Sequence, residues 1–491
     1  MINAVSRSEL GSNRARNIRS GNMVPAVIYG NEKEFLNVNI PLNELTKASQ
    51  NDLFFRPMKL ENPRTVNAWC MYDWANSVYN LVINTTIFPI YYDAITSNPD
   101  NGHVVRFFGL EVVNSVLYSW ALAASYLISA AILPLLSGIA DYTGQKKLYL
   151  KIFTLIGAIS CMAMYFFTGS RIEWGIACVV LASLGYSSSL VFYDAYLPEI
   201  VPETQTDRVS ARGYSFGYGG SALMLILSLV LITFYDSFGF PNEGFATRTV
   251  FLLVGIWWIG FAQIPFRRLP DNIFNRKPGK DVLLNGYREL LGVLMRLRGL
   301  SSMKFYLLAF FFFNMGVQTI MLLATLFGTK ELNLGSSDLI PTILIIQFVA
   351  IGGATLFARV SDRRGNIFSL LVMIVIWIGI CFYAYSITTV QQFYFIAVAV
   401  GLVMGGIQAL SRATFSKLIP VDSEDHTSFF SFFDVTYHLS VVIGTFSYGL
   451  IEQITGSMRN STLALASYFI IGFVLLLFVK MRNGTTAAQH S

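Results

Sequence analysis

The sequence predicts an all-α membrane protein whose twelve transmembrane helices form two halves of six. Three observations predict this class: 54% of the 491 residues are hydrophobic, only 13% are charged, and the mean hydropathy is +0.53. An ordinary soluble chain carries roughly 25% charged residues. With so few charges, a soluble fold would expose large apolar patches to water. The same composition excludes a disordered chain, which needs low hydrophobicity and high net charge.

The predicted spans follow from the length that a helix needs to cross a bilayer, about 20 mostly apolar residues. Six segments precede a long basic connection and six follow it. They cover residues 66–92, 112–140, 148–169, 174–197, 213–235 and 247–266, then 303–328, 339–360, 367–388, 391–415, 428–452 and 461–480. Pro134 is expected to interrupt the second span and Pro198 to end the fourth, because membrane helices tolerate proline or use it as a stop.

The loop charges predict the orientation. On the side shared with both termini, the basic residues include Lys146, Lys147, Lys151, Arg359, Arg363, Arg364 and the many in the connection 267–304. The opposite loops hold single ones: Arg106, Arg171, Arg248, Lys330 and Arg459. Because basic loops stay in the cytoplasm, both termini are predicted to be cytoplasmic. This topology accounts for the net charge of +6 without a nucleic-acid partner.

The basic connection also predicts the domain organisation. We expect a soluble extension, a first half, a cytoplasmic linker, a second half and a tail. Their limits are 1–60, 61–268, 269–302, 303–482 and 483–491. Residues 281–298 carry apolar side chains at helical spacing with basic residues between them. This pattern is typical of a helix lying on the membrane surface, or equally of a helix packed under the bundle.

A loop motif occurs twice, after the second span and after the eighth. Each copy sets small residues, then an Asp, then a Gly three positions later. The residues are Gly138, Asp141, Gly144 and Lys146 in the first copy, and Asp362, Arg363 and Gly365 in the second. Gly permits a sharp reversal between helices, and Asp can offer its charge to a helix N-terminus or an Arg. Recurrence six spans later indicates two equivalent halves, with the loops stabilising a closed state.

The paired loops resemble those of the major facilitator superfamily over residues 64–482. Residues 68–79 (Ala-Trp-Cys-Met-Tyr-Asp-Trp-Ala-Asn-Ser-Val-Tyr) resemble the entry segment of its vacuole-effluxer-like branch, named for an autophagy-related vacuolar amino-acid exporter. Further matching segments are 193–200, 208–213, 411–412, 417–420 and 429–434. Tyr437 and His438 depart from the usual Gly-Lys of the branch, and Thr445 from a usual Pro. The resemblance implies a bacterial twelve-helix transporter, with amino acids as one substrate class.

Polar residues inside spans are costly in hydrocarbon, so they face a cavity or a partner. In the first span Asp73, Asn76, Asn80 and Asn84 follow one helical stripe, at spacings of 3, 4 and 4. One interpretation is that the stripe lines the central cavity, with Asp73 unpaired and exchanging a proton with the solute path. The other is that Asn80 and Asn84 join helices while Asp73 lies at the interface.

Two more polar sets carry alternatives of the same kind. Asn314 and Gln318 in the seventh span line the cavity or hydrogen-bond between helices. Asp194 and Arg412, near cytoplasmic helix ends, form a gate between the halves or are solvated charges close to loops.

In the eleventh span Asp434 and His438 are four residues apart and can meet on one helix face. A carboxylate beside an imidazole suits proton coupling. The alternative is a structural Asp–His pair.

Residues 1–60 differ from the rest because they are polar and basic. Gly11–Arg19 and then Val24–Gly30 resemble the start of a 5S-rRNA-binding ribosomal protein, up to about Phe55. Half of such a domain leaves open strand edges and too small a core, which argues against RNA binding. We interpret the segment as a fused gene fragment or a mis-called start, in preference to a transit peptide.

Together these patterns predict a secondary active transporter, not an enzyme, that moves a small solute by alternating access. We expect proton coupling, efflux, a monomer in the bacterial inner membrane, and no metal or cofactor. The alternatives are an uncoupled facilitator and, from another class, an RNA-contacting protein tethered by its spans. Sugars, peptides and drugs stay open as substrates beside amino acids.

The topology is testable by labelling single cysteines with a membrane-impermeant reagent. We expect Ser97→Cys to react from outside the cell and Asn275→Cys to react only after lysis, because the basic connection is cytoplasmic. Labelling of Asn275→Cys in intact cells would reverse the orientation.

Overall fold

The chain folds as two compact units, Met1–Leu60 and Glu61–Ser491. The computed structural model describes residues 5–6, 23–28, 36–41, 63–97, 104–271, 282–332, 334–420, 423, 425–455 and 458–481. Asn275 and the whole predicted tail, residues 483–491, lie outside these ranges.

The first unit contains a three-stranded antiparallel sheet of order β1-β3-β2. Its strands are β1 (Val5–Ser6), β2 (Met23–Ile28) and β3 (Leu36–Pro41). β2 and β3 pair along their full length, from Met23 opposite Pro41 to Ile28 opposite Leu36.

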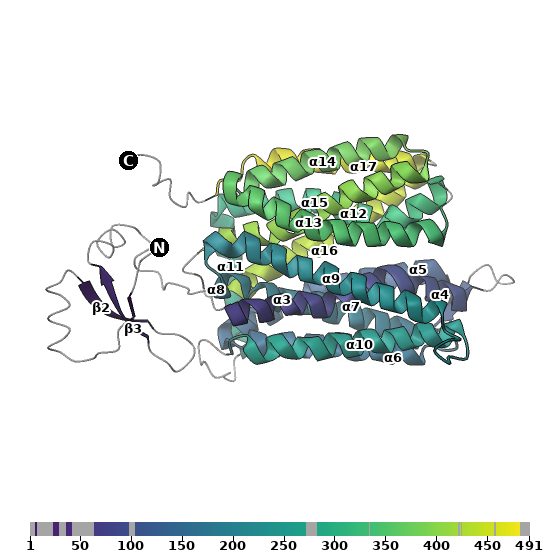
Figure 1. Cartoon of the computed structure of the whole chain (residues 1–491), viewed down its shortest axis with the longest axis horizontal. Coiled ribbons are helices and arrows are strands. Elements are labelled where there is room, and N and C mark those ends of the chain that lie inside the picture. Colours follow the sequence, from purple (N-terminus) through teal and green to yellow (C-terminus); the bar gives the residue numbers. More distant parts are fainter. Residues whose placement is uncertain are drawn as a thin grey trace. The chain divides into compact units, whose positions relative to one another are not determined.

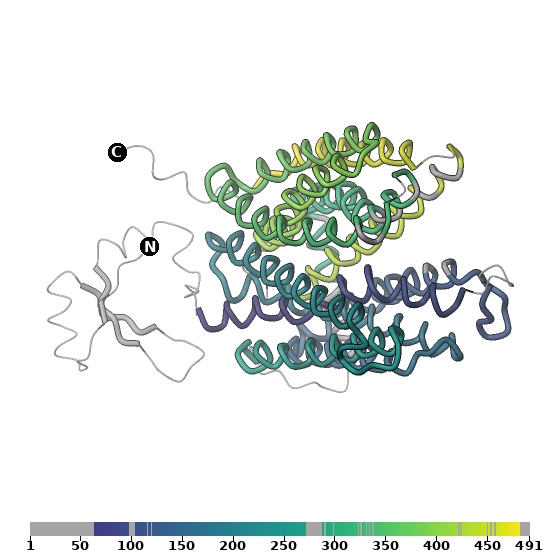
Figure 2. The backbone as a smooth tube through the Cα atoms, turned by 45° about the vertical axis from the view of Figure 1, so that its right-hand side comes forward, coloured from purple at the N-terminus to yellow at the C-terminus, as the bar shows by residue number. Residues whose placement is uncertain are grey.

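The second unit is a helical bundle, drawn in Figure 1 as a lower layer of early helices and an upper layer of late ones. The early helices are α3 (Pro63–Val78), α4 (Phe88–Thr96), α5 (Asn114–Thr143), α6 (Lys146–Ala163), α7 (Ile172–Asp194), α8 (Leu197–Ile200), α9 (Thr206–Thr233) and α10 (Glu243–Arg268). The late helices are α12 (Ser301–Leu332), α13 (Ser336–Arg364), α14 (Asn366–Ser386), α15 (Val390–Leu418), α16 (His426–Thr455) and α17 (Met458–Leu476). Figure 2 follows the same two layers along the backbone.

Among the described residues, eleven helices are long and apolar enough to cross a membrane. They correspond to the second through twelfth predicted spans. The first predicted span is built differently, because the π-helix η1 (Tyr79–Ile87) joins α3 to α4 without leaving the helical path. Pro89, near the start of α4, lacks the N–H that would bond the carbonyl of Thr85, which favours a widened turn before it. Wide π-turns often mark functional sites.

Short elements complete the unit. They are the hairpin β4 (Val104–Phe107) and β5 (Leu110–Val113), the 3₁₀ turns η3 (Met164–Phe166) and η4 (Glu203–Gln205), and α11 (Val282–Gly299). The expected interruption at Pro134 is wrong, since α5 continues through it to Thr143. Because the proline lies inside a long helix packed by neighbours, one lost hydrogen bond does not end the helix.

The amphipathic segment 281–298 forms α11, which packs against α5 and also contacts α12 and α16. Val293 and Leu297 are buried there, whereas Tyr287 and Met295 are exposed. Of the two interpretations of the segment, the helix packed on the bundle is the one that the structure shows.

Within each half, helices approach closely through glycine. Gly213, Gly217 and Gly220 of α9 face α3, so that a Cβ on Gly220 would lie 2.8 Å from the Trp74 carbonyl oxygen. In the second half, Gly353 of α13 faces α15, where a Cβ would lie 2.7 Å from the carbonyl carbon of Leu402. Missing side chains therefore allow backbone-to-backbone packing that makes each half a rigid body.

This packing can be tested with neighbouring glycines of α13. Gly353→Ala should lower the melting temperature of the purified protein, at a cost of about 1–3 kcal/mol, because the new methyl group collides with backbone that cannot move aside. Gly352→Ala is the matched control, since its Cβ would enter open space. Equal melting temperatures for the two variants would contradict close α13–α15 packing.

Candidate functional site

The two halves meet at the end of the bundle that carries both loop motifs, here termed the motif end. α9 of the first half packs against α13 and α15 of the second, and α16 of the second half packs against α5 and α7 of the first. In Figure 1 these helices lie where the two layers face each other. The interface is therefore built from helices that begin or end next to a motif loop.

Arg412 of α15 crosses this interface and ends among side chains of the first half. Its side chain is only 2% exposed. The guanidinium carbon lies 4.7 Å from the ring centre of Trp69, 5.5 Å from that of Tyr193 and 4.3 Å from that of Tyr214. Three aromatic faces suit a weakly hydrated guanidinium, which is attracted by their π-electrons.

The aromatic walls are themselves fixed by contacts inside the first half. The rings of Trp69 and Tyr193 stack with centres 4.5 Å apart, and the Trp69 indole N–H donates to the Tyr193 carbonyl at 3.0 Å. α3 and α7 thus hold their side chains in place independently of Arg412. The second half inserts its cation into a preformed pocket.

Two carboxylates from different helices bind the guanidinium. Asp73 Oδ2 lies 3.3 Å from Arg412 Nη2 and Asp194 Oδ1 lies 3.0 Å from Arg412 Nη1. The Tyr193 hydroxyl donates to Asp73 Oδ2 at 2.9 Å. Arg412 Nε also donates to the Ser210 hydroxyl at 3.0 Å, and that hydroxyl donates to the Ala409 carbonyl at 2.7 Å. We term Asp73, Asp194 and Arg412 the ion node.

The ion node joins α3 and α7 to α15. Its contacts bear on two predictions from the sequence, one about Asp194 and Arg412 and one about Asp73. Asp194 and Arg412 do pair across the halves, and Arg412 is not a solvated charge near a loop. Asp73 is not the unpaired carboxylate that its polar stripe suggested, because the arginine of another span reaches it. A partner 339 residues away leaves no signal in the local spacing.

The first loop motif closes onto the second half through Asp141. Its carboxylate accepts backbone N–H groups of Thr427 at 3.1 Å and Ser428 at 2.6 Å, in the first turn of α16. Orphan N–H groups and the helix dipole both favour an anion at this position. Asp141 therefore caps a helix of the opposite half.

A second contact lies beside this cap. Glu199 of α8 forms an ion pair with Lys146 of the motif and lies 2.9 Å from His426 Nδ1, the first residue of α16. Nearby, Arg296 of α11 pairs with Asp425. The N-terminus of α16 is thus held by groups from α5, α6, α8 and α11.

The second loop motif closes onto α9 in the mirrored position. Asp362 pairs with Arg208 at 2.6 Å, while Asp207 accepts from Ser361 at 2.8 Å and from Asn366 at 2.7 Å. Lys417 lies 2.7 Å from Asp207. Arg208 is 70% exposed, so the Asp362 pair is more solvated than the Asp141 cap.

The motif glycines make the reversals. Gly144 ends α5 with φ of 70° and Gly365 ends α13 with φ of 87°, values that strain any residue with a Cβ. Gly138 is buried inside α5, and Arg363 is exposed. Both turns therefore have the geometry that the motif predicted.

The polar stripe of the first span is buried but only partly hydrogen-bonded. Asn84 donates to the side-chain oxygen of Asn80 at 3.1 Å, within the π-helix. Asn76 Nδ2 and Asn84 Oδ1 are buried without a hydrogen-bond partner in the described part of the chain. Unsatisfied buried polar atoms call for an explanation such as a bound solute or water. Cavity lining by Asn76, Asn80 and Asn84 stays a prediction.

In the seventh span, Asn314 donates to the Ser440 hydroxyl at 2.6 Å and accepts from Gln318 at 3.2 Å. The bond to Ser440 joins α12 to α16 inside the second half, and the bond from Gln318 lies within α12. The interhelical alternative thus has direct contacts, and cavity lining by this pair stays a prediction.

Asp434 and His438 meet on one face of α16, with Oδ2 and Nε2 2.9 Å apart. The imidazole stacks on Tyr126 of α5, with ring centres 5.0 Å apart. The pair therefore lies at the interface between the halves.

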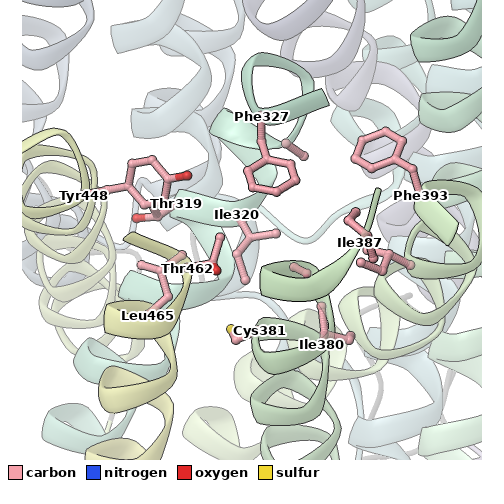
Figure 3. Close-up of a pocket in the computed structure, with 13 residues that line it drawn as sticks. Thr319, Ile320, Phe327, Ile380, Cys381, Ile387, Phe393, Tyr448, Thr462 and Leu465 are labelled. Carbon is pink, nitrogen blue, oxygen red and sulfur yellow. The ribbon is translucent and has the colours of Figure 1, made fainter. Parts of the chain in front are cut away.

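A separate apolar pocket lies wholly within the second half (Figure 3). Figure 3 shows Ile320, Phe327 and Phe393 with other side chains of α12, α14, α15, α16 and α17 around it. Its lining is almost entirely hydrocarbon, and it contains none of the predicted site residues. It is not the candidate solute site.

Sequence reasoning missed the aromatic pocket and the groups that brace it. Trp69 and Tyr193 stood in matched segments but carried no charge, and Ser210 and Asp207 looked like ordinary residues near a helix start. A signal was available: a lone Arg inside a predicted span needs anions and aromatics from elsewhere.

Fold and paired motif loops together define a transporter of the major facilitator type, which is not an enzyme. Residues 61–489 match the family described as "Vacuole effluxer Atg22 like", and the chain belongs to this family. Residues 2–97 also match the ribosomal L25p family; this overlaps the first match over 61–97, where the structure is helical from residue 63 to 96.

Individual relatives agree with the family. The uncharacterized MFS-type transporter YxiO of Bacillus subtilis (strain 168) is 31% identical over 86% of this chain and 96% of its own length. Autophagy-related protein 22 of Yarrowia lipolytica is 23% identical over 79% of each chain. The crystal structure of the human organic anion transporter MFSD10 has a TM-score of 0.65 at 10% identity, covering 84% of this chain and 99% of that one, which shows the shared fold.

The two motif aspartates should differ in effect. Asp141→Asn weakens a buried cap on α16 by about 1 kcal/mol, which corresponds to about a fivefold change in a conformational equilibrium. We expect its uptake rate in proteoliposomes to fall several-fold while KM stays within a few-fold. The uptake rate of Asp362→Asn should fall less, because the partner of Asp362 is solvent-exposed and such pairs contribute about 0–1 kcal/mol. Loss of solute binding with a normal rate of conformational exchange would contradict a gating role.

Proposed function

We propose that this protein is a proton-coupled secondary transporter that exports a small solute, with amino acids as the favoured class, by rocking its two halves about a central site. The observation that carries the proposal is the chemistry of the interface at the motif end. Contacts between the halves include several ion pairs, a helix cap and hydrogen bonds, whereas contacts within each half include close backbone approaches at glycine.

This division favours motion between rigid bodies. Dense backbone packing cannot be broken without large cost, but polar contacts can be exchanged for water when the interface opens. A surface-exposed pair such as Arg208–Asp362 contributes about 0–1 kcal/mol. The motif end therefore has the properties of a gate.

Proton coupling is supported by titratable groups at the same interface. Asp73 is buried between the halves, and Asp434 with His438 stacks against Tyr126 of the opposite half. Opening of the interface would change the surroundings of both sets. The uncoupled facilitator is the rival that a gradient experiment tests.

The substrate class and direction are supported by the family alone. The matched family is named for a vacuole effluxer, and the vacuole-effluxer resemblance implies amino acids. Buried amide groups of the first-span stripe are compatible with solutes that form several hydrogen bonds. Cytoplasmic termini, a bacterial inner membrane and a monomer belong to the same proposal. The loop charges support the orientation of the termini.

A transport assay in proteoliposomes tests the proposal. Counterflow of radiolabelled amino acids is expected, with sugars and dipeptides as the comparison panel, and accumulation is expected only with a pH gradient. For one coupled proton, one pH unit can drive a concentration ratio of about tenfold.

The matched control is a variant that lacks residues 1–60. Its transport should equal that of the full chain, because the bundle is a separate unit. Loss of transport in the truncated protein would favour the rival hypothesis, in which the spans tether an RNA-contacting first unit to the membrane. Equal uptake with and without the gradient would identify a facilitator.

A further inference from the structure

We propose that Asp73 and Asp194 share one exchangeable proton beside Arg412 whenever the motif end is closed, and that opening of this end releases it. The inference rests on the proposed transport function and names the site of its coupling proton. It moves the proton from Asp73 alone, or from Asp434 and His438, to a pair of carboxyl groups whose partner belongs to the other half.

The first step is a count of charges. Arg412 supplies one positive charge, and Asp73 and Asp194 supply two carboxyl groups, all within ion-pairing distance. In the described part of the chain, no other cation forms an ion pair with either carboxylate. The remaining contacts come from neutral hydroxyls of Tyr193 and Ser210. With both carboxyl groups ionised, the ion node would carry a net negative charge.

Burial makes this imbalance expensive. Side-chain exposure is 2% for Arg412, 6% for Asp73 and 15% for Asp194. An uncompensated ion is strongly disfavoured in such surroundings, even beside a paired neighbour. One proton on the two carboxyl groups restores one cation to one anion. The closed interface therefore favours the singly protonated pair.

The surrounding titratable groups do not supply the missing positive charge. Cys70 lies on α3, Tyr186 on α7, Tyr214 and Tyr218 on α9, and Asp434 and Tyr437 on α16. Asp434 acts electrostatically on Asp194 and adds negative charge. Arg212, the nearby cation on α9, is exposed and lies over the ring of Phe216. Every neighbour is thus neutral, negative or directed elsewhere.

Close packing favours a proton over a metal cation. A Cβ placed on Gly213 would lie 2.6 Å from Asp73 Oδ2 and 3.0 Å from both Arg412 Nη2 and the Trp69 ring. The backbone of α9 therefore fills the space next to the ion node. A sodium or larger ion needs a shell of several oxygen ligands, for which these contacts leave no room, whereas a proton needs no extra volume.

Hydrogen bonding distinguishes the two members. Asp73 Oδ2 accepts from the Tyr193 hydroxyl and from both terminal nitrogens of Arg412. Asp194 accepts one bond from Arg412 and is the more exposed of the two. Three donors stabilise the anion on Asp73, so Asp194 is the member through which the proton exchanges with water. Because the groups interact strongly, the titration belongs to the pair.

The consequence for transport follows from linkage. The closed motif end binds one more proton than the open, hydrated one, so acid favours the closed state and alkali favours opening. If the motif end is cytoplasmic, the pair takes up its proton from the opposite side of the membrane while this end is closed, and each opening releases that proton inside the cell. Export of the solute on the same cycle is then antiport against protons that move inward.

The test reads the gate directly, without a known substrate. Spin labels on Arg268→Cys of α10 and Arg359→Cys of α13 report the separation of the halves at the motif end, and both side chains are exposed. The four native cysteines are buried. In lipid nanodiscs the short-distance population of the otherwise unchanged protein should fall as pH rises from 5 to 9. The ratio of the short-distance to the long-distance population should change by at most about tenfold per pH unit, as for one linked proton.

Variants locate the proton. Asp194→Asn and Asp73→Asn should each abolish the pH response, because either change balances the node without a proton. Asp434→Asn should retain it, and Asp362→Asn should shift the populations while keeping the pH dependence. A pH response that survives in both node variants, or that Asp434→Asn removes, would overturn the proposal. The proposal would also be overturned if the labelled parent protein did not respond to pH. This measurement keeps the proposal testable even if the variants do not fold.

Transport separates this inference from the proposed function. Gradient-driven accumulation in the parent that Asp194→Asn lowers about tenfold, with counterflow retained, supports both. Accumulation by Asp194→Asn equal to the parent shows a coupled transporter whose proton lies elsewhere. A pH-responsive gate in a protein that accumulates nothing shows that the ion node titrates and that the proposed coupling is wrong.

Discussion

Burial of the Arg412 guanidinium in the opposite half is the constraint on which the rest of the structure depends. A cation within a span needs anions, hydrogen-bond acceptors for its N–H groups and polarisable side chains around it. No single helix can provide all three. Here α3 and α7 supply the carboxylates, α3, α7 and α9 the aromatic rings, and α9 the Ser210 oxygens. Once Arg412 is inserted, the positions of these helices relative to α15 are fixed at the motif end.

The two loop motifs surround this node with similar geometry and unequal chemistry. Asp141 caps the first turn of α16 in a buried contact, whereas the mirrored Asp362 pairs with a largely exposed Arg208. On the second side the buried role passes to Asp207, which Ser361, Asn366 and Lys417 bind. Internal repetition therefore fixes where these contacts between the halves occur, while the residues of each copy decide how much water they exclude.

The fold was largely predictable from sequence, and the site only in part. Hydrophobic segment length depends on nearby residues, so the spans were found; η1 was missed because a π-turn depends on the Pro89 backbone and leaves no hydropathy signal. Spacing correctly joined Asp434 to His438, a contact within one helix. It left Asp73 unpaired, because ion pairs between spans depend on tertiary packing that no local period encodes.

A net charge on the ion node is what allows protonation to be coupled to closure of the motif end. Had one carboxylate faced Arg412, the closed interface would be balanced at neutral pH and indifferent to a proton gradient. The second carboxylate makes closure and protonation favour each other, since burial penalises the charge that a proton removes. Gly213 of α9 fits the same reasoning, because a Cβ there would collide with the Asp73 carboxylate and press on the Arg412 guanidinium. Protonation of the ion node can then affect the whole bundle, because α9 packs against α3 through close backbone contacts and the two helices must move together.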